Sequence, residues 1–360
     1  MLFRSNLLAE INPETGESAR KATGSFYTPR TVVDYMVDKG ITEYLVEKTG
    51  LHREWLAALV TYDKSDDIIL NLEDADRRKI VEALADLRAL DPACGSGAFP
   101  IGLLQKIVYV LQLTDPECEI WTEIECARVS PEYRRVLKRG LTENGAEYVR
   151  KLGVIRRCIY GVDIQAVATE IARLRCFLTL IVDAKVDDTL DNRGIEPLPN
   201  LEFKFVTANS LLSLSASAAE ETQGQLFENT TLLTELQLIR EEYFASDPDD
   251  KEIIKRDFDR VQANMRRGIA LSHTDSSLKY ERLSTWQPFD HSSTDWFNSD
   301  WMFGVSEFDL ILANPPYLGE KGHKELFQTI KSSSLGVFYS KNMDLFYFFF
   351  HLAQIGRAHV

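Results

Sequence analysis

Cysteine is scarce in this chain, with five residues in 360. Their spacing lacks the close pairs of a zinc site and indicates no disulfide framework; the five are Cys94, Cys118, Cys126, Cys158 and Cys176. This usage suits a reducing compartment. We therefore predict a cytoplasmic protein without a structural metal.

Long hydrophobic runs are also missing. The start of the chain has no signal-peptide pattern, and the apolar run at residues 345–350 is far too short to span a bilayer. We expect no membrane partner.

Basic residues are outnumbered, at 41 Lys and Arg against 55 Asp and Glu, which gives a net charge of −14. Phosphate contacts need Lys and Arg, so this balance lowers the expectation of DNA binding. It does not exclude it, because net charge describes the whole chain and not one cleft.

Short apolar runs alternate with helical patterns along the chain, which predicts an α/β fold with a doubly wound parallel sheet. Strands are expected at residues 88–91, 155–161, 203–208 and 308–313, and helices at 29–48, 51–88, 98–113, 165–183, 232–244, 250–265 and 341–354. Thr28 is a candidate cap for the first of these helices. In the helix at 165–183, five apolar residues are spaced for burial: Val167, Ile171, Leu174, Leu178 and Ile181.

A glycine-rich turn, Asp91-Pro92-Ala93-Cys94-Gly95-Ser96-Gly97, follows the first predicted strand. Glycines allow a tight turn, so a ligand can lie against the next helix; a purely structural turn is an equal alternative. Asp163 and Asn209 follow the next two strands, so the same sheet edge offers groups for ribose and adenine. The alternatives are a helix cap for Asp163 and a turn for Asn209.

The sequence Asn314-Pro315-Pro316-Tyr317 directly follows the fourth predicted strand. An exocyclic amine is a poor nucleophile because its lone pair is delocalised into the ring. The amide oxygen of Asn314 and the carbonyl of Pro315 offer two adjacent acceptors, the prolines stiffen the loop, and Tyr317 offers a face for stacking on a base. With the glycine turn, this favours methyl transfer from S-adenosylmethionine to an amino nitrogen over a structural proline-rich loop.

With these motifs, the chain resembles S-adenosylmethionine-dependent DNA adenine-N6 methyltransferases of the gamma arrangement. The likeness is to the methylase portion of type IIG restriction-modification and BREX-type phage-defence enzymes. It covers most of residues 24–350 and implies a Rossmann-like class I methyltransferase fold that is truncated and carries a helical insertion. The implied cofactor-binding residues are Tyr27, Thr28, Pro29, Asp91, Ala93, Cys94, Gly95, Gly97, Asp163, Ile164 and Asn209. Many relatives carry an acid where Asn209 stands, which leaves its adenine contact open.

The resemblance also implies a partner, double-stranded DNA with a flipped adenine, and a target-recognition domain that is missing from these residues. A second aromatic should face the flipped base, and Phe338 or Tyr339 is the expected match. Cytosine-N4 methylation remains open. Two other functions stay as alternatives: a protein-glutamine N5-methyltransferase, because an amide nitrogen poses the same chemical problem, and a non-catalytic DNA-binding modification subunit.

The expected organisation is an arm at residues 1–25, a cofactor-binding half at 26–210, a largely helical insertion at 211–305 and a catalytic segment at 306–354. Residues 1–5 and 355–360 match translations of a common sequencing adapter. We therefore expect native sequence from about Asn6 to Gln354.

Overall fold

The computed structural model describes residues 28–61, 72–129, 131–183, 200–213, 234–244, 246, 250–271, 282–290 and 292–355. Tyr27, the arm at 1–25 and the adapter-like residues 356–360 lie outside this part of the chain. Within it, no helix is both long and apolar enough to cross a membrane.

The described residues contain one parallel sheet with the strand order β3-β2-β1-β4. Its strands are β1 (Ala89–Asp91), β2 (Ile159–Asp163), β3 (Phe205–Thr207) and β4 (Leu310–Ile311). β1 pairs with β2 on one side and, across a long separation in sequence, with β4 on the other. The predicted α/β class and parallel sheet are confirmed. Three strands fall within the predicted runs, and β2 overlaps the run at 155–161 but continues to Asp163.

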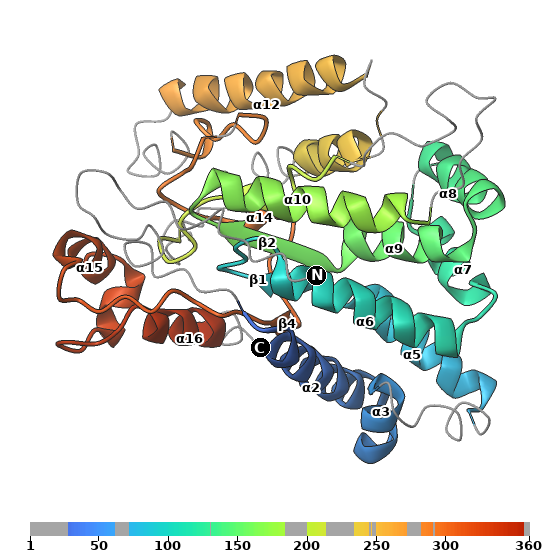
Figure 1. The fold of residues 1–360 in the computed structure, drawn as a ribbon. Helices are drawn as coiled ribbons and strands as arrows, with labels where there is room; N and C mark the ends of the chain where they lie inside the picture. Colours follow the sequence, from blue (N-terminus) through green and yellow to red (C-terminus); the bar gives the residue numbers. More distant parts are fainter. Residues whose placement is uncertain are drawn as a thin grey trace, which may run out of the picture.

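Helices surround this sheet on both faces (Figure 1). Those before β3 are α2 (Arg30–Thr49), α3 (Arg53–Val60), α5 (Asp74–Asp86), α6 (Ala98–Thr114), α7 (Glu119–Ala127), α8 (Pro131–Glu143), α9 (Ala146–Arg157) and α10 (Ala166–Ile181). Those after it are a helix at 234–244, α12 (Lys251–Leu271), α14 (Ser299–Phe303), α15 (Lys324–Lys331), the 3-10 turn η3 (Ser334–Phe338) and α16 (Phe346–Ile355).

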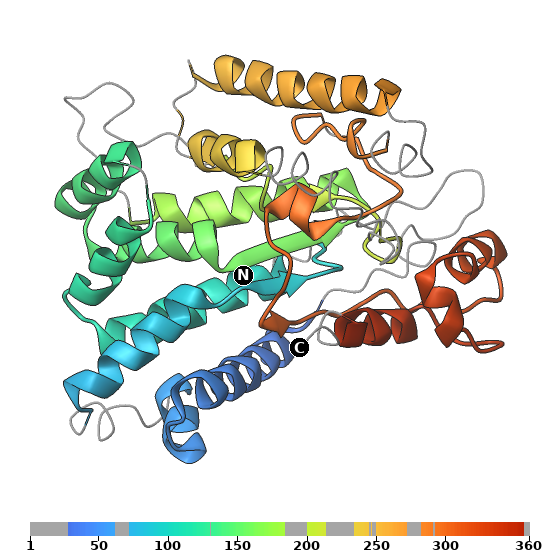
Figure 2. The same cartoon turned by 180° about the vertical axis from the view of Figure 1, so that it is seen from behind.

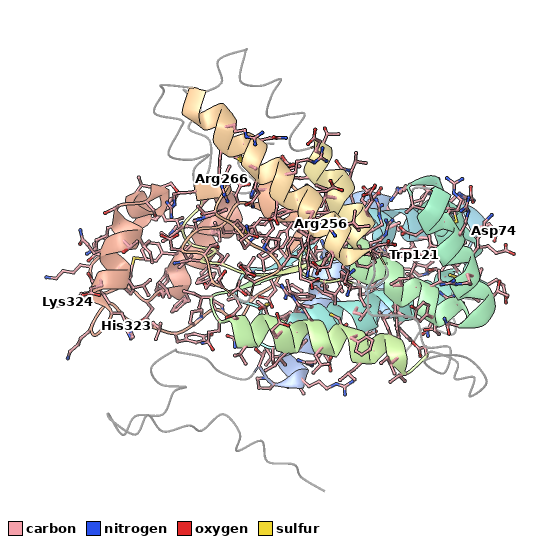
Figure 3. The ribbon with its side chains drawn as sticks, turned by 90° about the horizontal axis from the view of Figure 1, so that it is seen from above. Asp74, Trp121, Arg256, Arg266, His323 and Lys324 are labelled. Carbon is pink, nitrogen blue, oxygen red and sulfur yellow. The ribbon has the colours of Figure 1, made fainter. Side chains whose placement is uncertain are left out.

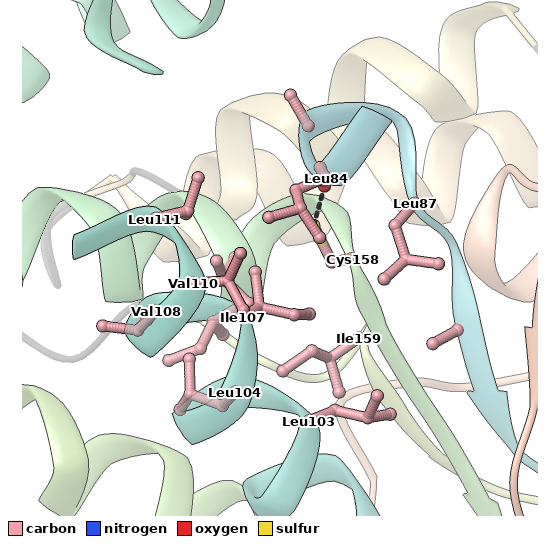
Figure 4. Packing of buried hydrophobic residues seen from close by; sticks show 14 of the residues in the cluster. Leu84, Leu87, Leu103, Leu104, Ile107, Val108, Val110, Leu111, Cys158 and Ile159 are labelled. Atoms are coloured by element: carbon pink, nitrogen blue, oxygen red, sulfur yellow. Dashed lines mark hydrogen bonds between the residues drawn. The ribbon is translucent and has the colours of Figure 1, made fainter. Parts of the chain in front are cut away.

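Side chains alternate between the two faces of the sheet, as the period of a strand requires. Ala89, Ile159 and Phe205 point into a core formed with α2, α3, α5, α6, α7, α9 and α10. Figure 4 shows part of this core, where the Cys158 thiol also donates to the carbonyl oxygen of Leu84 at 3.4 Å.

The opposite face of the sheet is covered by residues from the long excursion between β3 and β4. Leu90, Tyr160 and Val206 pack there against the helix at 234–244, α12, α14 and nearby aromatic side chains. Figure 2 shows α14 and its flanking chain on this face. The excursion therefore supplies the second helical layer of the fold.

The catalytic segment forms a third small core from α15, η3 and α16, which includes Phe327 and Phe348. Figure 3 shows α15, marked by His323 and Lys324, at the opposite end of the molecule from Trp121 and Asp74, with Arg256 and Arg266 along α12.

Asp309 ties α2 to the sheet just before β4. One oxygen of its carboxylate lies 3.0 Å from Lys48 Nζ in α2, and the other accepts a hydrogen bond at 3.0 Å from the main-chain N–H of Arg88, next to β1. This aspartate thus aligns the start of β4 with the start of β1.

Two local predictions were wrong. Thr28 does not cap α2, because Pro29 occupies the N-cap position without a side-chain hydrogen bond. The second strand begins at Ile159, because α9 continues through Arg157.

The predicted buried face of α10 was also wrong, since Val167, Leu174 and Leu178 are each at least half exposed. Instead the face with Ala172, Cys176 and Leu180 is buried. A Cβ added to Gly97 would lie only 3.0 Å from the Cβ of Ala172. The close approach of α10 to the glycine turn needs this small-residue face, and it turns the larger apolar residues outward.

This orientation of α10 predicts contrasting effects of two substitutions in one helix. Leu174→Gln should change the free energy of unfolding by less than about 0.5 kcal/mol, as for an exposed site. Leu180→Ala should cost about 2–5 kcal/mol because it leaves a cavity in the core. Urea unfolding of both variants measures this, and a large cost for Leu174→Gln would contradict the orientation.

Candidate functional site

The carboxyl ends of all four strands meet at one edge of the sheet because every pairing is parallel. The strand order reverses at β1, since the chain runs outward to β2 and β3 and then returns to β4 on the other side. Ligands of open α/β sheets bind at such a reversal. The glycine turn after β1 and the Asn-Pro-Pro-Tyr segment after β4 flank it.

The glycine turn has a backbone that only glycine adopts readily. Gly95 has φ of 52° and Gly97 has φ of 81°, both in the left-handed region. Among the described residues, no atom outside Gly95 and its two chain neighbours lies within 4 Å of the Cβ position of Gly95, so this part of the structure leaves open space in front of the turn. The N-terminus of α6 follows directly, and its free N–H groups and dipole favour an electron-rich ligand.

Asp163 lies beside the turn at the end of β2. Its Oδ2 accepts a hydrogen bond from the N–H of Gly95 at 2.9 Å, and its Oδ1 accepts one from the N–H of Gln165 at 2.9 Å. The carboxylate therefore orders both the glycine turn and the entry to α10. A carboxylate has about four acceptor sites, so two main-chain donors leave capacity for ligand hydroxyls.

Asp91 is a second carboxylate at this edge and is almost fully buried. Its Oδ1 accepts from the N–H of Ala93 at 3.1 Å. Burial, and then the nearby charge of Asp163, raise the pKa of Asp91 well above its usual range. Burial likewise raises the pKa of Asp163 and, well above the usual value, that of the Cys94 thiol. Because burial is the main cause, this edge is shielded from water, and further negative charge beside Asp91 and Asp163 is disfavoured.

The turn after β3 joins the same edge through a residue that the sequence did not single out. Ser210 is buried, and its hydroxyl donates to the carbonyl oxygen of Pro92 at 2.7 Å. Asn209 accepts a hydrogen bond from the N–H of Leu211 at 3.2 Å, which is a local turn contact. Ile164 is exposed beside Asp163. Only the position of Ser210 next to Asn209 pointed to it in the sequence.

Asn314 is fixed by the segment that precedes α2. Its Nδ2 donates to the hydroxyl oxygen of Thr28 at 3.1 Å, and Thr28 is buried. This contact joins residues 286 positions apart. The amide oxygen of Asn314 has no hydrogen-bond donor among the described residues, so it remains available as an acceptor. Pro315 and Pro316 are half-buried and follow it.

Tyr317 and Phe338 are two of the exposed aromatic side chains in residues 306–354, along with Tyr347 and Phe350 on α16 itself, and α16 contacts both Tyr317 and Phe338. Tyr317 is 55% exposed, and its ring lies 5.5 Å from that of Phe346 at the start of α16. Phe338 stacks on His351 in the same helix, with ring centroids 4.1 Å apart and nearly parallel planes. The sequence pattern did not identify Phe346 or His351, since both appear there only as parts of an apolar helix.

Tyr339 has other contacts. Its hydroxyl donates to the carboxylate of Glu320 at 2.8 and 2.9 Å, and the Lys331 ammonium lies 3.8 Å from its ring centroid. Lys331, the N–H of Asn342 and Tyr339 together lower the pKa of Glu320 to about 2. Each ring has one face covered, Tyr339 by Lys331 and Phe338 by His351. Phe338 is nevertheless the more accessible of the two candidates, because it is exposed and Tyr339 is only partly so.

Similarity to known proteins was found in the same region. A family model described as “Eco57I restriction-modification methylase” matches residues 157–355. A curated protein of Methanocaldococcus jannaschii, named as a putative type II restriction enzyme and methyltransferase, is 30% identical over 203 residues. That match covers 54% of this chain and 15% of the relative, so the chain corresponds to a small part of a much longer protein.

The raised pKa of Asp91 predicts a pH-dependent effect of Asp91→Asn. The folded chain holds this proton more tightly than the unfolded chain, so wild-type stability falls as pH rises from about 4 through the folded pKa. The Asp91→Asn variant has no carboxyl group at this position, so its stability does not fall for this reason. Its melting temperature relative to wild type should therefore increase with pH between about 4 and 8, measured by thermal denaturation. Exposed Asp259→Asn is the control and should show no trend; a flat profile for both would contradict the assignment.

Proposed function

The chain belongs to the Eco57I restriction-modification methylase family, and we propose that it transfers a methyl group from S-adenosylmethionine to the N6 amino group of adenine in DNA. The observation that carries this proposal is the hydrogen bond from Asn314 to Thr28. It holds the Asn314 amide across the strand reversal from the glycine turn, and the amide oxygen has no hydrogen-bond donor among the described residues. An amine acceptor and a methyl donor would have to meet at this reversal.

S-adenosylmethionine suits the groups present at the sheet edge. The open space at Gly95 admits a ligand against the turn, and Asp163 keeps acceptor capacity for both ribose hydroxyls. Asp91 and Asp163 favour a cation, and the cofactor carries a sulfonium. The cofactor supplies an electrophilic methyl group. Thr28, Pro29, Ala93, Cys94, Gly97, Ile164 and Asn209 would complete its surroundings, as would Tyr27, which lies outside the described residues.

Asn314 and Pro315 prepare the nucleophile. The amide oxygen and the Pro315 carbonyl accept the two amino protons, which localises the nitrogen lone pair and aims it at the methyl carbon. A bound cofactor would supply the methyl group, with the nitrogen–carbon bond forming as the carbon–sulfur bond breaks. Asn314 and Pro315 would hold the amino protons until one is lost to solvent. No side chain has to ionise. In this proposal the residues accelerate the reaction by holding the amine and the methyl donor in the right geometry.

Tyr317 and Phe338 hold the base. A target amine inside a duplex is out of reach, so the base has to leave the stack, at a cost of a few kcal/mol. Stacking on an aromatic ring recovers about 1–3 kcal/mol per base. We assign the first contact to Tyr317 and the second to Phe338, because α16 supports both rings and Tyr339 is engaged by Glu320 and Lys331. Recognition of the DNA sequence is expected from a separate target-recognition region.

Protein-glutamine N5-methylation remains the alternative, because it needs the same amine-accepting turn. A restriction-modification family favours DNA as the substrate. Methyl transfer from labelled cofactor to duplex DNA or to a release-factor-like protein distinguishes the two.

The Thr28–Asn314 contact predicts a graded loss of activity in the complete protein that carries this chain. Asn314→Ala should abolish methyl transfer while cofactor binding persists, because its amide acts only in the chemical step. Thr28→Val should lower kcat by about tenfold or more, the value of one hydrogen bond, and Thr28→Ser should restore it. Transfer of labelled methyl groups to duplex DNA measures kcat. Full activity of Thr28→Val would show that this contact does not position the amide.

The Asp163 assignment predicts a selective binding defect. Asp163→Ala removes charge-assisted hydrogen bonds to the ribose and should weaken S-adenosylmethionine binding by about 1.5–3 kcal/mol. Calorimetric titration of the chain measures this, and circular dichroism controls for folding. Asp183→Ala, at the far end of α10, is the matched control. Unchanged cofactor affinity of a folded Asp163→Ala protein would reduce this residue to a helix cap.

A further inference from the structure

A cavity of about 170 Å³ lies at the amino-terminal edge of the sheet, opposite the edge described above. It is lined by Arg88 and Lys204, which directly precede β1 and β3, and by Arg157 and Val305, which lie a few residues before β2 and β4. The helix at 234–244 lines it as well. None of these residues belongs to the proposed methyl-transfer site.

The lining is strongly cationic although the whole chain has a net charge of −14. Five cationic side chains face two carboxylates there: Arg88, Arg156, Arg157, Lys204 and Arg240 against Asp86 and Glu241. Arg128 neutralises Asp86 at 2.8 Å. Cations therefore predominate around the cavity.

Structural contacts account for part of this charge. Arg156 and Arg157 share the buried carboxylate of Glu125, at 3.1 and 3.3 Å. Arg240 donates to the carbonyl oxygen of Trp301, near the end of α14, at 2.9 Å. The helices α5, α9 and α14 end at the cavity, and each contributes about half a unit of negative charge. Even so, the balance around the cavity stays positive.

The positive charge of Lys204 is not balanced by contacts of this kind. Among the described residues its ammonium has no hydrogen-bond acceptor, and its nearest recorded contact is the Tyr160 ring, 4.0 Å from Nζ to centroid. Burial, and then the charges of Arg156, Arg157 and Arg240, lower the pKa of Lys204 well below its usual value. A cation in these surroundings gains most from an anion that reaches it through the cavity.

We propose that this cavity binds a phosphate-sized oxyanion, either free or as the phosphoryl group of a small molecule such as a nucleotide, with Lys204 as its central ligand. The volume corresponds to about five or six water molecules in the liquid, which admits the five heavy atoms of phosphate. The DNA backbone is a poor fit, because the cavity and the methyl-transfer site lie at opposite edges of the sheet. A duplex seated on Tyr317 would face away from Lys204.

Calorimetric titration of the 360-residue chain in chloride buffer tests the site, with inorganic phosphate, ATP and a 12-base-pair duplex as separate probes. Phosphate or ATP should bind wild type, and Lys204→Met should weaken that binding at least about tenfold. Lys138→Met, on the exposed side of α8, should bind as wild type does. Without phosphate, Lys204→Met should melt at or above the wild-type temperature, because a charge that lies among Arg156, Arg157 and Arg240 has been removed.

Arg88→Gln provides a second variant in case Lys204→Met does not fold, because Arg88 is exposed at the cavity rim. It should also weaken binding, while folding normally. Similar affinities for phosphate and ATP would identify a free oxyanion, and tighter ATP binding would identify a phosphorylated small molecule. The proposal is overturned if neither probe binds wild type, if both cavity variants bind as wild type does, or if only the duplex binds.

Discussion

The parallel pairing of β1 with β4 is the constraint on which the site depends. Ala89 pairs with Leu310 and Leu90 with Ile311, although the two strands are more than 200 residues apart in sequence. This register places the chain after Asp91 beside the chain after Ile311. Asp309 reinforces it by bonding the N–H of Arg88 and pairing with Lys48. Had β4 added beyond β3 instead, the Asn-Pro-Pro-Tyr segment would lie three strands from the glycine turn. The strand order therefore brings two separate motifs together at one edge of the sheet.

Two buried carboxylates lie at the carboxyl edge of the sheet, and their burial is electrostatically unfavourable. Asp91 and Asp163 are held close together with raised pKa values, mainly because burial removes them from water. Such a pair opposes folding at neutral pH and would be relieved by a cationic ligand. The folded chain is thus less stable at the edge where a charged cofactor is expected. Active sites commonly lower stability in this way for the sake of activity. The main-chain N–H groups of Ala93, Gly95 and Gln165 limit the loss, since each donates to one of these carboxylates.

Motif positions were predictable from the sequence, because each follows a short apolar run and parallel strands end at a common edge. The α/β class followed from the same pattern. The direction in which side chains face within each helix was harder to predict from the sequence. The apolar face of α10 was assigned to the core, but the fit of Ala172 against Gly97 decided otherwise. The contact between Thr28 and Asn314 spans most of the chain, so no local pattern could reveal it. The engagement of Tyr339 by Glu320 and Lys331 depends on a turn whose geometry appears only in the fold.

The two edges of the sheet also differ in charge, so a chain with a net charge of −14 still has a cavity lined mainly by cations. Acids gather at the carboxyl edge, where helices begin and dipoles are positive. Arginines and Lys204 gather at the amino edge, where α5, α9 and α14 end. Part of this pattern is the ordinary complement to helix dipoles. A cation that complements a helix dipole typically bonds the free carbonyl groups at the end of that helix, as Arg240 does with Trp301 near the end of α14. Lys204 instead lies over the ring of Tyr160 and faces a cavity, so its charge is directed to something other than the ends of these helices.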